Sequence, residues 1–440
     1  MPNRREPALR AEEVQKFNGA IEEKVYRIVL IGVSYKTSDI SYRESVYATL
    51  NRLQAELNDK ESISSEFLFL TTCNRIELYF ATIYPKELTD FILTRLCAAN
   101  DKNNVNFYIK TDVDAVSHLY SVAAGLDSIA IGEEQILQQI REASKSARLQ
   151  GTSRSILSSV FDSAITTSIK LRRKYHIKEL LHDSSLSSLG VQFLKDKLKK
   201  RLPVVLIIGN GKMARLAQRE LEDTYLYVAT SRPNNNIMNN LVKYVSYDDI
   251  RNVIKYCDIV ISATRKSDYV IKYDDITFDN TLYILDLGFP RNIDPKIRNH
   301  SNVVLYNVDD LAKYDGRSKI PNLELVKEEI QTEAEGFFNW LYATRLSPVL
   351  GKLFYRAEEI RTREVKFAMK RIGNLTEEQS KVVESLTKSI VNKLLSSVVT
   401  FVRQSNINVN TDQKLELVSA MFNLRGGKDT ERYSFGDKAE

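Results

Sequence analysis

The apolar residues of this chain follow three successive patterns, and the first pattern predicts a mixed α+β domain. Short apolar runs typical of strands alternate there with longer segments whose apolar residues recur at helical spacing. They predict strand 26–33, helix 45–57, strands 67–70 and 76–82, helix 87–98 and strand 105–109. This βαββαβ order is typical of ferredoxin-like domains. Helices are then predicted at 113–123, 135–149 and 155–173.

The second pattern alternates fully apolar strands with helical segments. It opens after Pro203 with V-V-L-I-I, which is typical of a strand buried on both faces of a parallel sheet. Further strands are predicted at 226–229, 259–262, 282–285 and 303–305. Such alternation predicts a doubly wound, Rossmann-type domain.

The third pattern is helical almost throughout, from about 323 to 424. Apolar stripes run on both sides of a break at Pro348, and Thr376 with Gln379 has the spacing of a capping box. Long amphipathic helices without a catalytic cluster usually bury their stripes against one another or a second subunit. The predicted boundaries are a flexible tail 1–24, domains 25–174, 175–320 and 321–425, and a disordered tail 426–440.

Composition excludes several classes of protein. The 440 residues suffice for about three domains of roughly 150 residues, and 43% apolar with 27% charged residues is ordinary for a globular protein. No apolar run could span a bilayer, and the N-terminus lacks a signal-peptide core. Cys73, Cys97 and Cys257 are too widely spaced for a zinc site or a disulfide framework, so we expect no metal and a cytoplasmic location. The net charge of +6 permits a nucleic-acid partner without requiring one.

Cys73 is the first candidate for chemistry. It lies in the run T-T-C-N-R between two predicted strands, with Arg75 two residues further on. A neighbouring cation favours the thiolate, which is the form that attacks carbon. The alternative is a small buried apolar residue, because free cysteine is among the most buried residue types.

A nucleotide site is predicted directly after the strand that follows Pro203. The sequence G-N-G-K-M-A opens a helix there, and a second strand follows at 226–229, which is the context that a dinucleotide fingerprint requires. The residues predicted to hold the cofactor are Gly209, Asn210, Gly211, Lys212, Met213 and Ala214. The alternative is a glycine turn in a generic α/β protein.

The end of the second strand indicates which cofactor binds. NAD sites usually carry an acid there for the ribose 2′-hydroxyl, whereas this chain has Ser231 and Arg232, which suit a 2′-phosphate. We therefore predict that NADPH binds here. The alternative is that Arg232 is only a solvated surface charge.

A reactive cysteine and an NADPH site in one chain suggest a thioester that hydride reduces to an aldehyde. Further motifs are G-L-D-S at 125–128, G-E-E-Q-I-L-Q-Q at 132–139, and P-R-N-I-D-P at 290–295 after Asp286. With T-C-N-R at 72–75, these motifs resemble the glutamyl-tRNA reductase family over about residues 27–425.

The resemblance implies the reduction of glutamyl-tRNA(Glu) to glutamate-1-semialdehyde, the first committed step of the five-carbon route to 5-aminolevulinate, porphyrins and haem. It also implies a homodimer formed through the C-terminal helices. A reactive aldehyde product further suggests handover to the glutamate-1-semialdehyde aminomutase that follows.

The resemblance also assigns residues. It makes Cys73 the nucleophile and puts His118 near the substrate, where we expect it to polarise the acyl carbonyl or serve the leaving 3′-hydroxyl. By itself, a helix histidine is more often a packing or surface residue. The residues implied to line the glutamyl pocket are Thr72, Cys73, Asn74, Arg75, Ser128, Glu133, Glu134, Gln135 and Gln139. Arg75 suits the substrate carboxylate and Glu133 its ammonium group, although acids at 133–134 also suit a helix N-terminus.

Two segments depart from the family pattern. S-Y-K-T-S-D stands at 34–39 where the family has N-H-K-T-A-P, so Tyr35 replaces a histidine and receives no role. Nothing is transferred to 175–189, and His176, His182 and His300 are assigned no function.

Two other functions stay open. A shikimate-type NADP dehydrogenase would share the cofactor domain but would not need a cysteine, so insensitivity to thiol alkylation would favour it. A catalytically silent tRNA-binding or scaffold protein would bind NADPH without turning over charged tRNA.

Overall fold

The structure is a computed structural model of the chain. It describes residues 26–59, 65–98, 107–177, 185–198, 202–231, 241–264, 266, 268–314, 322–341, 348–373, 376–403 and 411–424. The two predicted tails, 1–24 and 426–440, lie outside these residues. The chain divides into two compact units, one of residues 27–337 and one that contains residues 338–440.

The first sheet of the larger unit has four strands in the order β2-β3-β1-β4. Its strands are β1 (Arg27–Ser34), β2 (Ser65–Thr71), β3 (Arg75–Thr82) and β4 (Tyr108–Thr111), with helices α2 (Ile40–Asp59) and α3 (Pro85–Ala98) between them. All neighbouring strands are antiparallel. Strand order and connections confirm the predicted ferredoxin-like arrangement.

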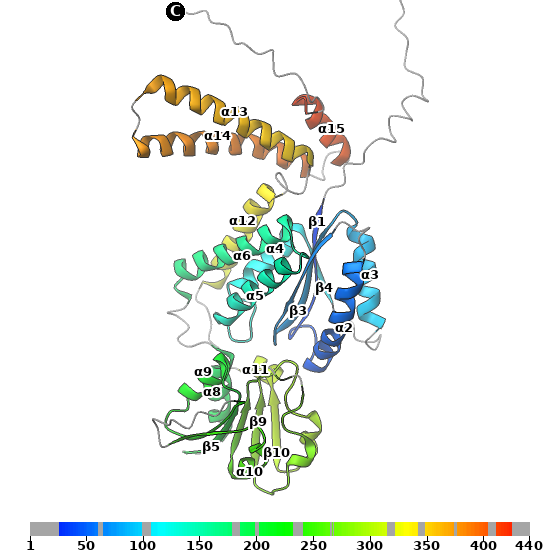
Figure 1. Ribbon diagram of the computed structural model, residues 1–440, viewed down its shortest axis with the longest axis vertical. Coiled ribbons are helices and arrows are strands. Elements are labelled where there is room, and N and C mark those ends of the chain that lie inside the picture. The colour runs from blue at the N-terminus through cyan, green and yellow to red at the C-terminus, as the bar shows by residue number, and fades with distance from the viewer. Residues whose placement is uncertain are drawn as a thin grey trace, which may run out of the picture. The chain divides into compact units, whose positions relative to one another are not determined.

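Helices cover both faces of this sheet (Figure 1). Apolar residues of α2 and α3 pack on one face. The other face is covered by α4 (Asp112–Ala123), α5 (Gln135–Leu149) and α6 (Ser155–Lys174). All eight residues of β3 are therefore buried, although apolar and polar residues alternate along part of it. Polar side chains of β3 must consequently find partners inside the protein.

The second sheet has six parallel strands in the order β10-β9-β8-β5-β6-β7. They are β5 (Val204–Ile208), β6 (Tyr225–Ala229), β7 (Val242–Val245), β8 (Ile259–Ser262), β9 (Leu282–Asp286) and β10 (Val303–Asn307). Counted from β5, this is the 3-2-1-4-5-6 order of dinucleotide-binding folds, which confirms the predicted Rossmann-type domain. The short edge strand β7 was not predicted, since four residues, V-K-Y-V, give little periodicity.

Helices and single turns connect these strands. They are α8 (Leu186–Leu198), α9 (Lys212–Arg219), α10 (Ile250–Val253), α11 (Val308–Ala312) and the 3₁₀ segments η1 (Ile254–Tyr256), η2 (Tyr273–Asp275) and η3 (Pro295–Asn299). Helix α8 was not predicted either.

The chain continues through α12 (Leu323–Leu341) into the smaller unit, which contains α13 (Pro348–Ile372), α14 (Glu377–Arg403) and α15 (Thr411–Met421). Thr376 N–H donates to Gln379 Oε1 (3.0 Å) and Gln379 N–H donates to Thr376 Oγ1 (3.2 Å), so the predicted capping box is present. Among the helices in the described ranges, none has the length and apolar content that crossing a membrane requires.

Candidate active site

Cys73 lies in the turn that joins β2 to β3. Thr72 N–H donates to the Arg75 carbonyl (2.9 Å), and Thr72 Oγ1 accepts hydrogen bonds from the N–H groups of Asn74 (3.2 Å) and Arg75 (3.1 Å). Tyr35 N–H, in the loop after β1, donates to the Asn74 carbonyl (2.9 Å). The half-buried Cys73 is thus held on a turn with little backbone freedom, which suits a nucleophile.

The Cys73 thiol is protonated in the free protein. Burial and the negative charge of Glu133 raise its pKa to about 12, against smaller opposing effects of Arg43 and Arg75. Arg75 thus favours the thiolate, as predicted, but its effect is outweighed in the free protein by burial and by the charge of Glu133.

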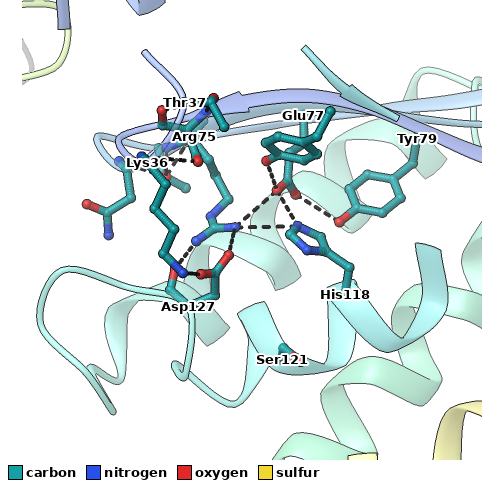
Figure 2. A network of polar contacts seen from close by, with 12 residues as sticks. Lys36, Thr37, Arg75, Glu77, Tyr79, His118, Ser121 and Asp127 are labelled. Carbon is teal, nitrogen blue, oxygen red and sulfur yellow. Dashed lines mark hydrogen bonds and ion pairs between the residues drawn. The ribbon is translucent and has the colours of Figure 1, made fainter. Parts of the chain in front are cut away.

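Arg75 is fully buried in a network of polar contacts around Glu77 (Figure 2). Its Nη1 donates to Glu77 Oε1 (3.1 Å) and Asp127 Oδ2 (2.9 Å), and its Nη2 donates to the Asp127 carbonyl. Lys36 pairs with the same Asp127 carboxylate. Arg75 Nε is buried and makes no hydrogen bond to the described part of the chain.

Glu77 is the centre of this network. Tyr79 Oη donates to its Oε2 (2.8 Å), Tyr108 Oη donates to its Oε1 (2.6 Å), and His118 Nε2 lies 2.7 Å from Oε1. Burial opposes ionisation of Glu77, but His118, Arg75 and these hydrogen bonds outweigh it and hold its pKa well below the usual range. Glu77 is thus a buried anion that ties β3 and β4 to α4.

Sequence reasoning missed Glu77. The available signal was the alternation of Arg75, Glu77 and Tyr79 on one face of a predicted strand, but this pattern alone did not show that the face is buried. His118, which we predicted to be functional, is joined to Arg75 through this carboxylate.

The loop between α4 and α5 carries the next group of predicted pocket residues. Arg172, from α6, donates from Nη1 to the Gly132 carbonyl (3.1 Å) and from Nη2 to the Glu133 carbonyl (2.7 Å). Burial raises the pKa of the Glu133 carboxyl to about 7, although the cations Arg172, Arg75 and Lys212 act in the opposite direction. Glu133 is therefore near its titration midpoint at neutral pH.

Two of the predicted pocket residues on this loop and α5 carry buried polar atoms that have no partner in the described part of the chain. Ser128 Oγ and Gln135 Nε2 make no hydrogen bond within the described ranges. Such atoms are costly unless water or a ligand satisfies them. Glu134 is exposed at the start of α5, and Gln139 lines a cavity of about 330 Å³ between α5 and β2 that also contacts Thr71.

The dinucleotide turn follows β5. Gly209 has φ +112°, and a Cβ there would lie 2.6 Å from the Ala263 carbonyl oxygen, so only glycine fits. Around Gly211 the space that a Cβ would occupy is open, and α9 begins at Lys212 without a side-chain cap. These features fit a pyrophosphate on the first amides of α9, flanked by Asn210, Met213 and the buried Ala214.

The predicted determinants of cofactor type are described only in part. Ser231 is exposed two residues after the end of β6, while Arg232 lies outside the described residues. Our prediction for Arg232 therefore stays a prediction.

The cysteine and the dinucleotide turn contact one apolar cluster. Ile40, Ile129 and Ala130 share this cluster with Ala214, and both Cys73 and Met213 pack against it. The fold and site thus define a nicotinamide-dependent type of protein, in which a Rossmann domain adjoins a cysteine on a rigid turn.

Comparison with known proteins identifies the family. The model of the glutamyl-tRNA(Glu) reductase N-terminal domain matches residues 31–175, and the dimerisation domain of the same family matches 325–424. Residues 193–314 match the shikimate/quinate 5-dehydrogenase model.

Whole-chain relatives agree with these matches. The glutamyl-tRNA reductase of Moorella thermoacetica is 31% identical over 428 residues, covering 90% of this chain and 95% of that one. The glutamyl-tRNA reductase of Pelotomaculum thermopropionicum is 28% identical, covering 90% and 94%. A solved glutamyl-tRNA reductase from Methanopyrus kandleri is 23% identical, covers 92% of this chain and 100% of that one, and gives a TM-score of 0.42. The family models and the Moorella relative show that this chain belongs to the glutamyl-tRNA reductase family.

The pKa of Cys73 predicts how alkylation depends on pH. Below its pKa the thiolate fraction rises about tenfold per pH unit, so the alkylation rate of Cys73 by iodoacetamide should still be rising at pH 10, beyond the value near 8.5 of a free thiol. The Glu133→Gln variant, which removes the repelling charge, should react faster above about pH 7, where the Glu133 carboxyl is ionised. Mass spectrometry of the Cys73 peptide measures this rate, and a plateau near pH 8.5 would contradict the assignment.

Proposed function

We propose that this chain reduces glutamyl-tRNA(Glu) to glutamate-1-semialdehyde with NADPH through a thioester on Cys73. The observation that carries the proposal is the contact of Cys73 and Met213 with one apolar cluster, since nucleophile and cofactor must meet in such a reaction. Family membership indicates glutamyl-tRNA as the substrate. Ser231 stands where NAD sites usually have an acidic residue, which supports NADPH over NADH.

The substrate itself can activate the thiol. Glu133 raises the pKa of Cys73, and the same carboxylate is the proposed partner of the substrate ammonium group. Ammonium binding neutralises that negative charge, so the thiol pKa falls when substrate is present. Ser128 Oγ and Gln135 Nε2 are further donors or acceptors for the glutamyl group, because neither has a partner in the described protein.

The substrate side-chain carboxylate needs a cationic donor. Both terminal nitrogens of Arg75 are engaged by Glu77 and Asp127, which leaves its buried Nε as the donor for an incoming carboxylate. Arg75 therefore organises this wall and offers one hydrogen bond. Thr72 and Asn74 act by fixing the turn that carries Cys73.

The first chemical step transfers the acyl group. The Cys73 sulfur attacks the ester carbonyl carbon, a C–S bond forms and the C–O bond to the tRNA breaks. The thiol proton goes to the leaving 3′-oxygen, with His118 as the proposed relay.

In the second step the thioester becomes an aldehyde. When bound, NADPH would supply the hydride for this reduction, and the amides at Gly211 and Lys212 would hold its pyrophosphate. The C–S bond then breaks, aldehyde is released and Cys73 leaves as the thiolate. In sum, ester, NADPH and one proton give aldehyde, free tRNA and NADP⁺.

We also propose that the chain forms a homodimer through its C-terminal helices, which match the family's dimerisation domain. Helix α14 exposes a line of large apolar side chains, which are Val382, Leu386, Ile390 and Leu394. Such a continuous line typically marks a protein interface. The cytoplasmic location and handover to an aminomutase remain predictions from cysteine usage and product reactivity.

The nucleophile can be tested in a single turnover with tRNA charged with labelled glutamate. The wild type should retain label on the protein without NADPH and release semialdehyde after NADPH is added. The Cys73→Ser variant should retain no label, and its rate of glutamyl-tRNA reduction should fall by at least about 10³-fold. Cys97→Ser is the matched control and should behave as wild type. Full reduction by Cys73→Ser would overturn the thioester, and no turnover by the wild type would favour the dehydrogenase or silent-binder alternatives.

The role of Glu133 predicts a pH dependence of substrate binding. Its pKa is raised, so the carboxyl becomes neutral as pH falls below about 7 and loses its attraction for ammonium. We expect the KM for glutamyl-tRNA to rise between pH 8 and pH 6, and to be high and flat in Glu133→Gln. The exposed Glu222→Gln serves as control and should keep the wild-type profile. A pH-independent wild-type KM would contradict this role.

The dimer proposal predicts an effect of charge on the α14 line. Leu386→Glu puts a carboxylate among apolar side chains, so light scattering of the full chain should show a shift from dimer to monomer. Asn392→Glu, exposed elsewhere on α14, should leave the dimer intact. A dimer unaffected by Leu386→Glu would exclude this line from the interface.

A further inference from the structure

The P-R-N-I-D-P motif has no part in the chemistry described so far. It forms the loop after β9, which is shaped by Asp286. The buried Asp286 carboxylate accepts hydrogen bonds from the N–H groups of Gly288 (3.0 Å), Asn292 (2.8 Å) and Ile293 (3.0 Å). A Cβ on Gly288 would lie 2.0 Å from Asn292 Oδ1, so the loop is closely packed. This loop therefore presents Arg291 in a fixed position.

Arg291 reaches the domain that carries Cys73. Its Nε (2.9 Å) and Nη2 (2.5 Å) donate to Glu44 Oε2 on α2, and its backbone N–H donates to Glu44 Oε1 (2.6 Å). Both side chains are mostly buried, at 14% and 19% exposure. A pair with this geometry and burial is worth more than an exposed surface ion pair.

Two further contacts surround this ion pair. Asp309, at the start of α11, accepts hydrogen bonds from the Ile40 N–H (2.7 Å) and from Nη2 of the fully buried Arg43 (2.6 Å). The rings of Tyr47 and Phe289 meet edge to face, with centroids 5.5 Å apart. The first two turns of α2 thus rest on the loop that follows β9 and on the start of α11, which follows β10.

These contacts join the two parts of the reaction. Ile40, which α2 presents beside Arg43, belongs to the apolar cluster against which Cys73 and Met213 pack. We propose that Glu44 and Arg291 are positioning residues for the reduction step, because their ion pair docks the dinucleotide domain against the domain that carries Cys73. The proposal rests on the proposed function.

The docking should affect the two chemical steps differently. Formation of the thioester needs only Cys73 and the glutamyl pocket, all within residues 72–139. Reduction also needs the correct placement of the dinucleotide domain, and a displacement of about 1 Å can cost on the order of 100-fold in rate. A merely structural role would slow both steps together.

The test uses the full chain with Glu44→Ala. We expect label trapping on Cys73 without NADPH within about twofold of wild type, and reduction of the trapped label slowed about 10- to 100-fold. Amide hydrogen exchange, measured without cofactor, should increase at 40–47 and 286–293. The charge swap Glu44→Arg with Arg291→Glu should recover part of the reduction rate and of the exchange protection.

Glu56→Ala is the matched control, because Glu56 also lies on α2 but pairs with Arg95 of α3 (2.6 Å), inside the same domain. It should leave trapping, reduction and exchange at 286–293 unchanged. An unchanged reduction rate in Glu44→Ala would overturn the proposal, and so would an equal loss in both steps that the charge swap does not restore. If wild type itself traps no label, the proposed function fails, while unchanged exchange in Glu44→Ala would separately refute the docking.

Discussion

The site depends on one buried charge, the carboxylate of Glu77. Its contacts come from β3, β4 and α4, and Arg75 extends them to Asp127 at the start of the pocket loop. Without this anion, the fully buried guanidinium of Arg75 would have the partly exposed Asp127 as its one remaining carboxylate partner among the described residues. Breaking a buried ion pair such as Arg75–Glu77 is strongly destabilising. A single electrostatic centre therefore holds the turn of Cys73, helix α4 with His118 and the loop of Asp127, and it engages both terminal nitrogens of Arg75.

The same surroundings keep the proposed nucleophile, Cys73, in an unreactive form. A protonated thiol with a pKa of about 12 reacts slowly with oxidants and electrophiles. In the proposed reaction, the charge that suppresses the thiolate is the charge that binds the substrate ammonium, so binding and activation are coupled through Glu133. This coupling requires a buried carboxylate, because solvent would screen the effect of an exposed one.

The sequence predicted much of the fold because its signals are local. The apolar run of β5 and the turn from Gly209 to Ala214 lie next to each other in the chain, and helix 135–149 was predicted at its observed bounds. The roles of Glu77 and Arg172 were not predicted, because each depends on a partner 39 to 41 residues away in the chain. Edge strand β7 was not predicted, because it depends on pairing with β6. Arg75 lowers the pKa of Cys73 as predicted, but burial outweighs this effect, and proximity in sequence does not show how deeply a thiol is buried.

Parallel-sheet geometry gives the docking its functional meaning. In doubly wound folds the dinucleotide lies at the carboxyl ends of the strands. Arg291 and Asp309 follow β9 and β10 at those same ends, and Gly209 follows β5. Helix α2 contacts Arg291 and Asp309, so it lies at the edge of the sheet where the cofactor is expected. Because α2 belongs to the same domain as Cys73, its first turns connect the proposed nucleophile to that edge. A helix docked elsewhere on the sheet would not make this connection.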